Sequence, residues 1–279
     1  LPQIVVRNWD SGEEYKVAFE EEAYSIELND RFDYSTNLLR FTYSSPTNPA
    51  QIYDYNMETK ERVLRKTQQV PCGHDPGSYV SCRLLAEASD GEKIPATIIY
   101  HKNTQIDGSA PVLLYGYGAY GVSLPAAFST ARLSIIDRGF IYAIAHVRGG
   151  TEKGYNWYHG GKLENKNNTF SDFVAVAQML IAKGFATSGN IAAHGGSAGG
   201  MLIGAVLNMQ PELWKAAVAE VPFVDVLNTM CDISLPLTPM EWPEWGNPID
   251  NKEDYLRILN YSPYDNVSKI SYPNILVTA

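Results

Sequence analysis

The chain has 279 residues, of which 45% are hydrophobic and 19% are charged, and its formal net charge is −9. This length suffices for one domain with a sizeable core and part of a second. The negative charge would repel a phosphate backbone, so we expect no nucleic acid partner. No apolar run approaches the roughly 20 residues that a membrane helix needs, so we expect no membrane partner.

The three cysteines, Cys72, Cys82 and Cys231, are odd in number and widely spaced. This spacing predicts neither a disulfide framework nor a metal site, and it suits free thiols in a reducing compartment such as the cytoplasm. The first ten residues lack the basic and apolar segments of a secretory signal, and they read as the middle of a longer chain. Neither a Walker-type loop nor a dinucleotide glycine pattern is present, so we expect no cofactor.

Residues 1–70 read as short strands separated by polar turns. The segment that begins at Gln3 aligns with the one that begins at Gln51, at an offset of about 48 residues that is typical of β-propeller blades. We therefore predict that residues 1–72 are the C-terminal part of a β-propeller. An isolated β-meander is the alternative.

The Pro- and Gly-rich segment 68–79 marks the expected domain boundary, and the pattern changes after it. Residues 73–279 contain near-continuous apolar strands that alternate with longer segments, and one of these is an amphipathic helix with Thr169 as its expected cap and Gly184 as its stop. This alternation predicts an α/β fold with a parallel sheet covered on both faces. The expected strands are 95–101, 111–118, 140–147, 190–195, 216–221 and 274–279.

The stretch "HGGSAGGM", 194–201, places Ser197 between a strand and a helix, with glycines on both sides. Such a nucleophile elbow needs a strained backbone at the serine and small neighbours, so that strand and helix can pass each other. Ser197 would then lie at a helix N-terminus, and the amide of Ala198 is a candidate oxyanion donor. A purely structural glycine-rich turn is the alternative.

A second oxyanion donor could come from "LLYGYGAYGVS", 113–123, at the end of another strand. Tyr115 and Tyr117 each carry a phenol there, and a phenol can hold an oxyanion as an amide does. Sites form at this edge of open parallel sheets. Aromatic packing at a strand end is the alternative interpretation for Tyr117.

Six blocks in order resemble the prolyl oligopeptidase family of serine peptidases, most closely its oligopeptidase B branch. The resemblance implies an α/β-hydrolase fold preceded by part of a β-propeller that admits only short peptides. It also implies that Ser197 attacks the scissile carbonyl, and that Tyr117 and Ala198 form the oxyanion hole. The blocks are "LLYGYGAYG", "HVRGGTEKG", "HGGSAGGM", "VPFVDVLNTM", "EWGNP" and "YSPYDNVS".

A general base for Ser197 is missing from the sequence. An α/β-hydrolase triad runs Ser, then Asp or Glu, then His along the chain, yet all five histidines precede Ser197: His74, His101, His146, His159 and His194. In the family, the acid follows the last strand seen here and the histidine comes later. We therefore expect residues 1–279 to be an internal fragment, truncated before the catalytic Asp and His and inactive by itself.

The resemblance also implies cleavage after Arg or Lys, since a buried guanidinium needs an anionic partner. Glu241 matches the first pocket glutamate of oligopeptidase B relatives, and we expect Phe223 to form an apolar wall. Pro243 occupies the position of their second pocket glutamate, and an acidic pair of dibasic-specific relatives is absent near Pro125. We therefore expect cleavage at single basic residues. A solvated loop glutamate is the alternative for Glu241.

Two other functions are compatible with the sequence. A prolyl-specific oligopeptidase would need an apolar pocket in place of Glu241. A non-catalytic hydrolase-fold protein that binds peptides would have lost its Asp and His, but the four glycines around Ser197 argue against such drift. Short peptides are the expected partners, and no oligomeric state is predicted.

Overall fold

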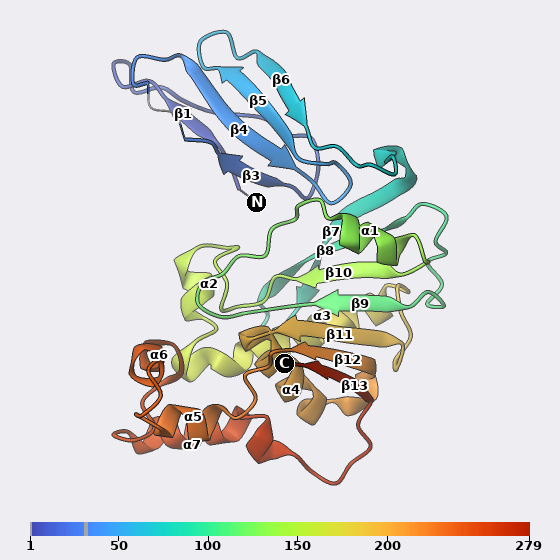
Figure 1. The fold of residues 1–279 in the computed structure, drawn as a ribbon, viewed down its shortest axis with the longest axis vertical. Helices are drawn as coiled ribbons and strands as arrows, with labels where there is room; N and C mark the ends of the chain where they lie inside the picture. Colours follow the sequence, from blue (N-terminus) through green and yellow to red (C-terminus); the bar gives the residue numbers. More distant parts are fainter. Residues whose placement is uncertain (1, 31–32) are drawn as a thin grey trace. The chain divides into compact units, whose positions relative to one another are not determined.

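The computed structural model describes residues 2–30 and 33–279, and it divides the chain into two compact units (Figure 1). Unit 1 comprises Leu1–Arg83, Ile99–Lys102 and Pro125–Arg138, and unit 2 comprises Leu84–Ile98, Asn103–Leu124 and Gly139–Ala279.

Unit 1 is built from antiparallel strands. A two-stranded hairpin, β1–β2, precedes a four-stranded sheet of order β3-β4-β5-β6. In the sequence repeat of about 48 residues, β1 and β2 correspond to β5 and β6. Aromatic side chains fill its core, where Phe41 is fully buried and Phe19 stacks on Tyr43 at 5.4 Å. The strands are β1 (Val5–Arg7), β2 (Glu14–Lys16), β3 (Ser25–Leu28), β4 (Leu38–Ser44), β5 (Gln51–Asn56) and β6 (Arg62–Thr67).

Unit 2 is organised around a seven-stranded sheet of order β13-β12-β11-β9-β10-β8-β7. All four pairings among β10, β9, β11, β12 and β13 are parallel, as the alternation of apolar strands predicts. The ends of β7 and β8 are grouped with unit 1. The strands are β7 (Tyr79–Glu87), β8 (Lys93–His101), β9 (Val112–Tyr115), β10 (Ile141–Ala145), β11 (Ile191–Gly196), β12 (Trp214–Glu220) and β13 (Asn274–Thr278).

The helices that cover the sheet of unit 2 come from the segments between its strands. Helix α4 packs on β11 and β12, while α3 packs on β10 and α4. Apart from short 3-10 turns, the helices are α1 (Thr130–Ile136, in unit 1), α2 (Tyr155–His159), α3 (Lys166–Ala182), α4 (Ala198–Met209), α5 (Val226–Cys231), α6 (Thr238–Trp245) and α7 (Lys252–Tyr261).

The start of α3 differs from the sequence prediction. The helix begins at Lys166, so Thr169 lies inside its first turn and is not its cap. Its hydroxyl instead donates to the carbonyl of Arg148 at 2.8 Å, which satisfies a buried backbone acceptor. Gly184 does follow the end of the helix, with φ +78, a conformation that suits glycine.

The strand order creates a switch point next to β9. The two strands that follow β9 along the chain lie on opposite sides of it, β10 on one side and β11 on the other. The loops that leave the carboxyl ends of β9 and β11 therefore diverge, and such a crevice is where open α/β sheets bind ligands. Tyr117 follows β9 and Ser197 follows β11.

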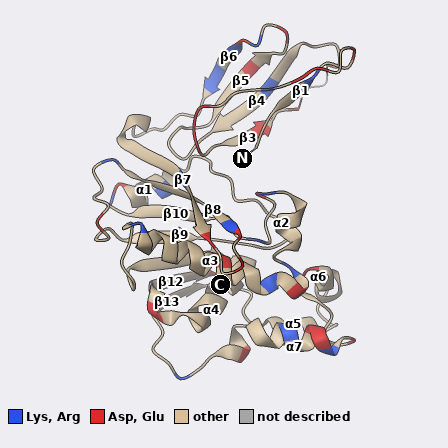
Figure 2. Cartoon of the chain, turned by 180° about the vertical axis from the view of Figure 1, so that it is seen from behind, with Lys and Arg blue, Asp and Glu red and all other residues tan. Residues whose placement is uncertain are grey.

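Charged residues of both signs occur in both units. Figure 2 shows Lys and Arg scattered over many elements of each unit, with Asp and Glu among them. Within the part of the chain that the structure describes, no helix is both long and apolar enough to cross a bilayer.

Candidate active site

Ser197 occupies a strained turn between β11 and α4. Its backbone has φ 55 and ψ −119, an uncommon conformation for a residue with a side chain. The turn is fixed from both sides, since the amide of Ser197 donates to Glu220 at 2.8 Å and its carbonyl accepts from the amide of Phe223 at 3.1 Å. The strain that the sequence predicts for a nucleophile elbow is thus present in the structure.

Three of the four neighbouring glycines are required by close backbone contacts. A Cβ on Gly195 would lie 2.4 Å from the carbonyl oxygen of Gly199, and one on Gly199 would lie 2.8 Å from that of Gly116. A Cβ on Gly200 would lie 2.5 Å from the Pro222 side chain. Gly196 differs from the expectation, because its nearest neighbours would be at 3.6 Å, an ordinary contact.

The strand register brings Tyr117 close to Ser197. Strands β9 and β11 pair Tyr115 with His194, whose rings contact each other at 5.1 Å, and both chains continue past this pair toward the site. Burial raises the pKa of Tyr117, while a hydrogen bond with the Ser197 side chain lowers it. Tyr117 therefore carries a protonated phenol beside Ser197. Tyr115 instead packs at the carboxyl end of β9.

Ala198 is the first residue of α4 and is buried. The first amides of a helix have no acceptor inside the helix and carry its positive dipole end. The amide of Ala198 and the phenol of Tyr117 are thus donors on two different segments next to the Ser197 side chain.

A cavity of about 430 Å³ opens beside Ser197, and both residues that the sequence assigns to substrate binding line it. Phe223 and Glu241 line it, together with Tyr120. The segment between α5 and α6 adds apolar groups. The other lining residues are Thr229, Met230, Leu235, Pro236, Leu237 and Thr238.

Glu241 lies in α6 rather than in a loop, and two neutral donors orient its carboxylate. The hydroxyl of Tyr120 donates to Oε2 at 2.7 Å and the indole of Trp245 donates to the same atom at 3.0 Å. The ring of Trp245 also contacts those of Phe223 at 5.8 Å and Tyr120 at 5.5 Å. The pocket thus presents a fixed carboxylate between aromatic walls.

Glu244 has a different role from Glu241. It is 4% exposed, and its carboxylate accepts from the amide of Tyr120 at 2.8 Å and from the hydroxyl of Tyr158 at 2.5 Å. Nothing in the sequence beyond the glutamate itself indicates this role. Glu241 and Glu244 are three residues apart in a helix, a spacing that puts both on one face. Their partners are known only from the structure.

His146 and His194 each lie against other polar side chains. His146 is buried, with Nε2 2.8 Å from the hydroxyl of Thr97 and Nδ1 3.5 Å from Glu152. Nε2 of His194 lies 3.2 Å from the carboxylate of Glu220. Among residues 2–30 and 33–279, no group of three or more His, Cys, Asp or Glu side chains is arranged to hold a metal ion.

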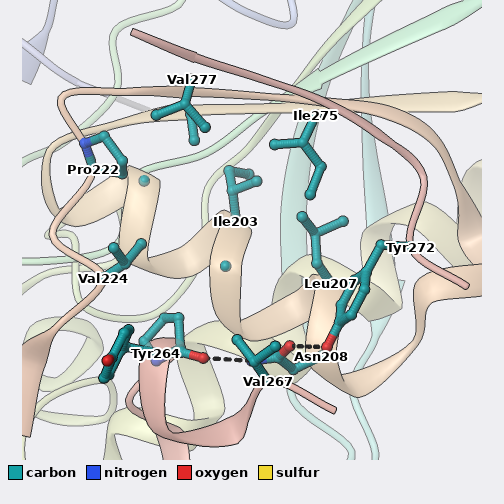
Figure 3. A pocket seen from close by; sticks show the side chains of 14 residues that line it. Ile203, Leu207, Asn208, Pro222, Val224, Tyr264, Val267, Tyr272, Ile275 and Val277 are labelled. Atoms are coloured by element: carbon teal, nitrogen blue, oxygen red, sulfur yellow. Dashed lines mark hydrogen bonds between the residues drawn. The ribbon is translucent and has the colours of Figure 1, made fainter. Parts of the chain in front are cut away.

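A second cavity, of about 330 Å³, lies along another part of α4 (Figure 3). Ile203 and Leu207 face it from α4, and Ile275 and Val277 face it from β13. Its main polar contact is the hydroxyl of Tyr272, which donates to Asn208 at 2.7 Å. The lining holds no acid or base for chemistry.

Comparison with known proteins identifies the family of the chain. The sequence profile described as "Prolyl oligopeptidase family" matches residues 126–279, which include the elbow at Ser197 and, apart from Tyr120, the residues that line the cavity beside it. The chain belongs to the prolyl oligopeptidase family. Members of this family are serine peptidases, so the resemblance drawn from the six sequence blocks is confirmed.

Individual relatives cover nearly the whole chain. It is 48% identical over 278 residues to dipeptidyl aminopeptidase BI of Pseudoxanthomonas mexicana and 40% identical over 267 residues to protease 2 of Moraxella lacunata. These alignments cover 99% and 96% of this chain but 38% and 39% of the relatives. The chain therefore spans well under half the length of the curated relatives that it matches.

Solved structures agree with the sequence relatives. Oligopeptidase B from Leishmania major superposes with a TM-score of 0.91 at 42% identity, covering 99% of this chain and 39% of that one. Oligopeptidase B from Trypanosoma brucei, solved with covalently bound antipain, gives the same TM-score and identity, covering 99% of this chain and 40% of that one.

Proposed function

We propose that the whole protein is a serine endopeptidase that cleaves short peptides after Arg or Lys. The observation that carries the proposal is the cavity in which Ser197, on its strained turn, and the oriented carboxylate of Glu241 meet. A nucleophile and an anionic specificity pocket in one cavity suit a substrate with a cationic side chain before the scissile bond.

The hydroxyl of Ser197 attacks the scissile carbonyl in this scheme and passes its proton to a general base. The phenol of Tyr117 and the amide of Ala198 donate to the oxyanion that forms. The amine then leaves with the proton from the base, and water hydrolyses the acyl ester. Since the chain spans about 38% of its relative in Pseudoxanthomonas mexicana, we place the catalytic Asp and His in the remaining part of the protein.

The pocket residues would contact different parts of a basic substrate side chain. The stem of an Arg or Lys side chain would lie along Phe223, and its charged end would reach Glu241. Because Pro243 replaces a second pocket glutamate and Glu244 is occupied by Tyr120 and Tyr158, a single carboxylate serves the substrate. Cleavage at single basic residues follows from this arrangement.

A second candidate activity is the release of dipeptides from a free amino terminus. The relative with 48% identity is named dipeptidyl aminopeptidase BI, and that name favours this alternative. An exopeptidase of this kind recognises the substrate's α-amino group, whereas an endopeptidase accepts a blocked one. The two activities are therefore distinguished by the substrate's amino terminus.

The domain arrangement and the location are part of the proposal. We assign residues 1–72 to the end of a β-propeller and residues 73–279 to an α/β-hydrolase domain, supported by the blade-like sheet β3–β6 and the parallel sheet β9–β13. The three cysteines are free thiols, which supports a cytoplasmic location.

Hydrolysis of chromogenic dipeptides by the full-length protein tests the function. Substrates ending in Arg, Lys or Pro, each with a blocked or a free amino terminus, separate the candidate activities. We expect cleavage of blocked Arg and Lys substrates and a loss of at least about 10⁴-fold in kcat for Ser197→Ala. Cleavage of Pro substrates alone would contradict the pocket assignment, and cleavage of free dipeptides alone would favour the exopeptidase.

A further inference from the structure

The loop that carries Tyr117 makes an unusual turn directly after it. Gly118 has φ +76, Tyr120 has φ +57 and Gly121 has φ +69, so three residues around the buried Ala119 adopt left-handed backbone conformations. Tyr120 is bulky and pays a steric cost for this conformation. Such a turn persists only when its surroundings hold it.

A buried lysine holds one side of this turn. Nζ of Lys166, at the start of α3, donates to the carbonyl of Gly118 at 2.6 Å and to that of Gly161 at 3.3 Å. Lys166 is 1% exposed, and its Nζ lies 5.0 Å from the ring centroid of Trp245. A hydrogen bond is stronger in a buried site than in water, and the amine of Lys166 can donate to a carbonyl in either protonation state.

A buried glutamate holds the other side. Glu244 of α6 accepts from the amide of Tyr120, so side chains from two different helices bind the peptide groups on both sides of Ala119. Burial lowers the pKa of Lys166 to about 7, although the negative charge of Glu244 acts in the opposite direction. The buried position thus disfavours the charged form of Lys166, although the side chain makes two hydrogen bonds there.

We propose that Lys166 and Glu244 are positioning residues that fix the turn after Tyr117 and thereby hold its phenol at Ser197. They touch neither the substrate nor the reacting atoms. Tyr117 immediately precedes Gly118, so a shift of this turn moves the phenol away from the place where the oxyanion forms, and small displacements there are costly in rate. The inference rests on the proposed function and adds the residues on which its oxyanion hole depends.

Two variants of Glu244 form the main test, in the full-length protein. Glu244→Gln keeps an oxygen acceptor for the Tyr120 amide, while Glu244→Leu has a similar volume and no acceptor. We expect Leu to lower kcat at least about 10-fold with KM within about twofold, and Gln to keep kcat within about threefold. Equal losses in both variants, or no loss in Leu, would overturn the proposal.

Lys166→Met tests the other side of the turn, with Lys183→Met as its control because Lys183 is exposed at the far end of the same helix. We expect a fall in kcat of at least about 10-fold for Lys166→Met and no change for Lys183→Met. A kcat within twofold of the parent in a folded Lys166→Met protein would contradict the proposal.

Hydrogen exchange of residues 117–122, followed by mass spectrometry, gives a readout independent of activity. Glu244→Leu should speed exchange in this segment at least about tenfold, and Glu244→Gln should not. Faster exchange with an unchanged kcat would overturn the link from the turn to Tyr117. If the parent protein cleaves no peptide while exchange behaves as expected, the proposed function fails and the fixing of the turn stands.

Discussion

The hydroxyl of Tyr120 donates to Oε2 of Glu241 at 2.7 Å, and the indole of Trp245 occupies the same oxygen. Oε1 of Glu241 has no such donor among the described residues. An arginine that binds a carboxylate through both oxygens must compete with Tyr120 or Trp245 for Oε2, whereas a lysine can bind Oε1 alone.

Tyr120→Phe should therefore raise the preference for Arg over Lys. Loss of the phenol hydroxyl frees a lone pair on Oε2 for the second arm of a guanidinium. We expect the ratio of kcat/KM for Arg and Lys substrates to rise about three- to tenfold. The ratio is measured with blocked dipeptides in the full-length protein. An unchanged or lower ratio would show that Oε2 is not what limits Arg binding.

Glu241→Gln should weaken cleavage after both basic residues. A neutral carboxamide cannot pair with a buried cation, and we expect kcat/KM to fall by about 10²-fold or more for Arg and Lys substrates. The matched control is Glu253→Gln at the exposed start of α7. Unchanged kcat/KM for Glu241→Gln would remove this residue from the pocket.

The glycines at the elbow allow a paired test of its packing. A Cβ on Gly199 would press on the carbonyl oxygen of Gly116 at 2.8 Å and on Cα of Tyr117 at 3.3 Å, whereas Gly196 has room. Gly199→Ala should destabilise the fold by about 1–3 kcal/mol and reduce kcat, while Gly196→Ala should be tolerated. Thermal unfolding and kcat of the two variants decide this, and equal effects would contradict the steric account.

Lys166 should make stability depend on pH. Its pKa is lowered from 10.5 to about 7 in the folded chain, so between these pH values the unfolded chain binds a proton that the folded chain lacks. The free energy of unfolding attributable to Lys166 should therefore rise with pH across this window, by about 1 kcal/mol per pH unit. The measurement is denaturant unfolding of the parent and Lys166→Met at several pH values. If their difference does not change with pH, the lysine keeps its ordinary pKa.

The 279-residue chain by itself should not hydrolyse peptides. Its buried His146 contacts Thr97 and its His194 lies against Glu220, so we expect neither to activate Ser197. Residual hydrolysis would come from the oxyanion hole and binding alone, orders of magnitude below the intact protein. A cooperative thermal transition establishes that the chain is folded before its activity is assayed. Activity equal to that of the full-length protein would contradict this assignment of the base.

Local chemistry explains why much of the fold was predictable. Apolar runs predict the strands of the parallel sheet, and the glycines around Ser197 indicate a close approach of strand and helix. The sequence predicts the start of α3 four residues late, because the hydroxyl of Thr169 is typical of a cap and instead donates to the carbonyl of Arg148. Tertiary contacts decided that boundary.

The site was less predictable where partners are distant in sequence. Glu241 was assigned by resemblance, but its donors Tyr120 and Trp245 became visible only once α6 and the loop after β9 were placed together. Lys166 and Glu244 are ordinary charged residues in the sequence, and nothing in their spacing reveals that both bind the turn around Ala119. Gly196 was expected to be as constrained as its neighbours, yet periodicity and composition do not report the space around a Cβ.

Covalent labelling of the full-length protein with a fluorophosphonate, followed by peptide mapping, tests the central claim most directly. We expect a single adduct on Ser197, loss of peptidase activity in proportion to labelling, and protection by a peptide ending in argininal. Labelling and activity should both vanish in Ser197→Ala. Peptidase activity that survives full labelling of Ser197, or that persists in Ser197→Ala, would contradict the claim that this serine is the nucleophile.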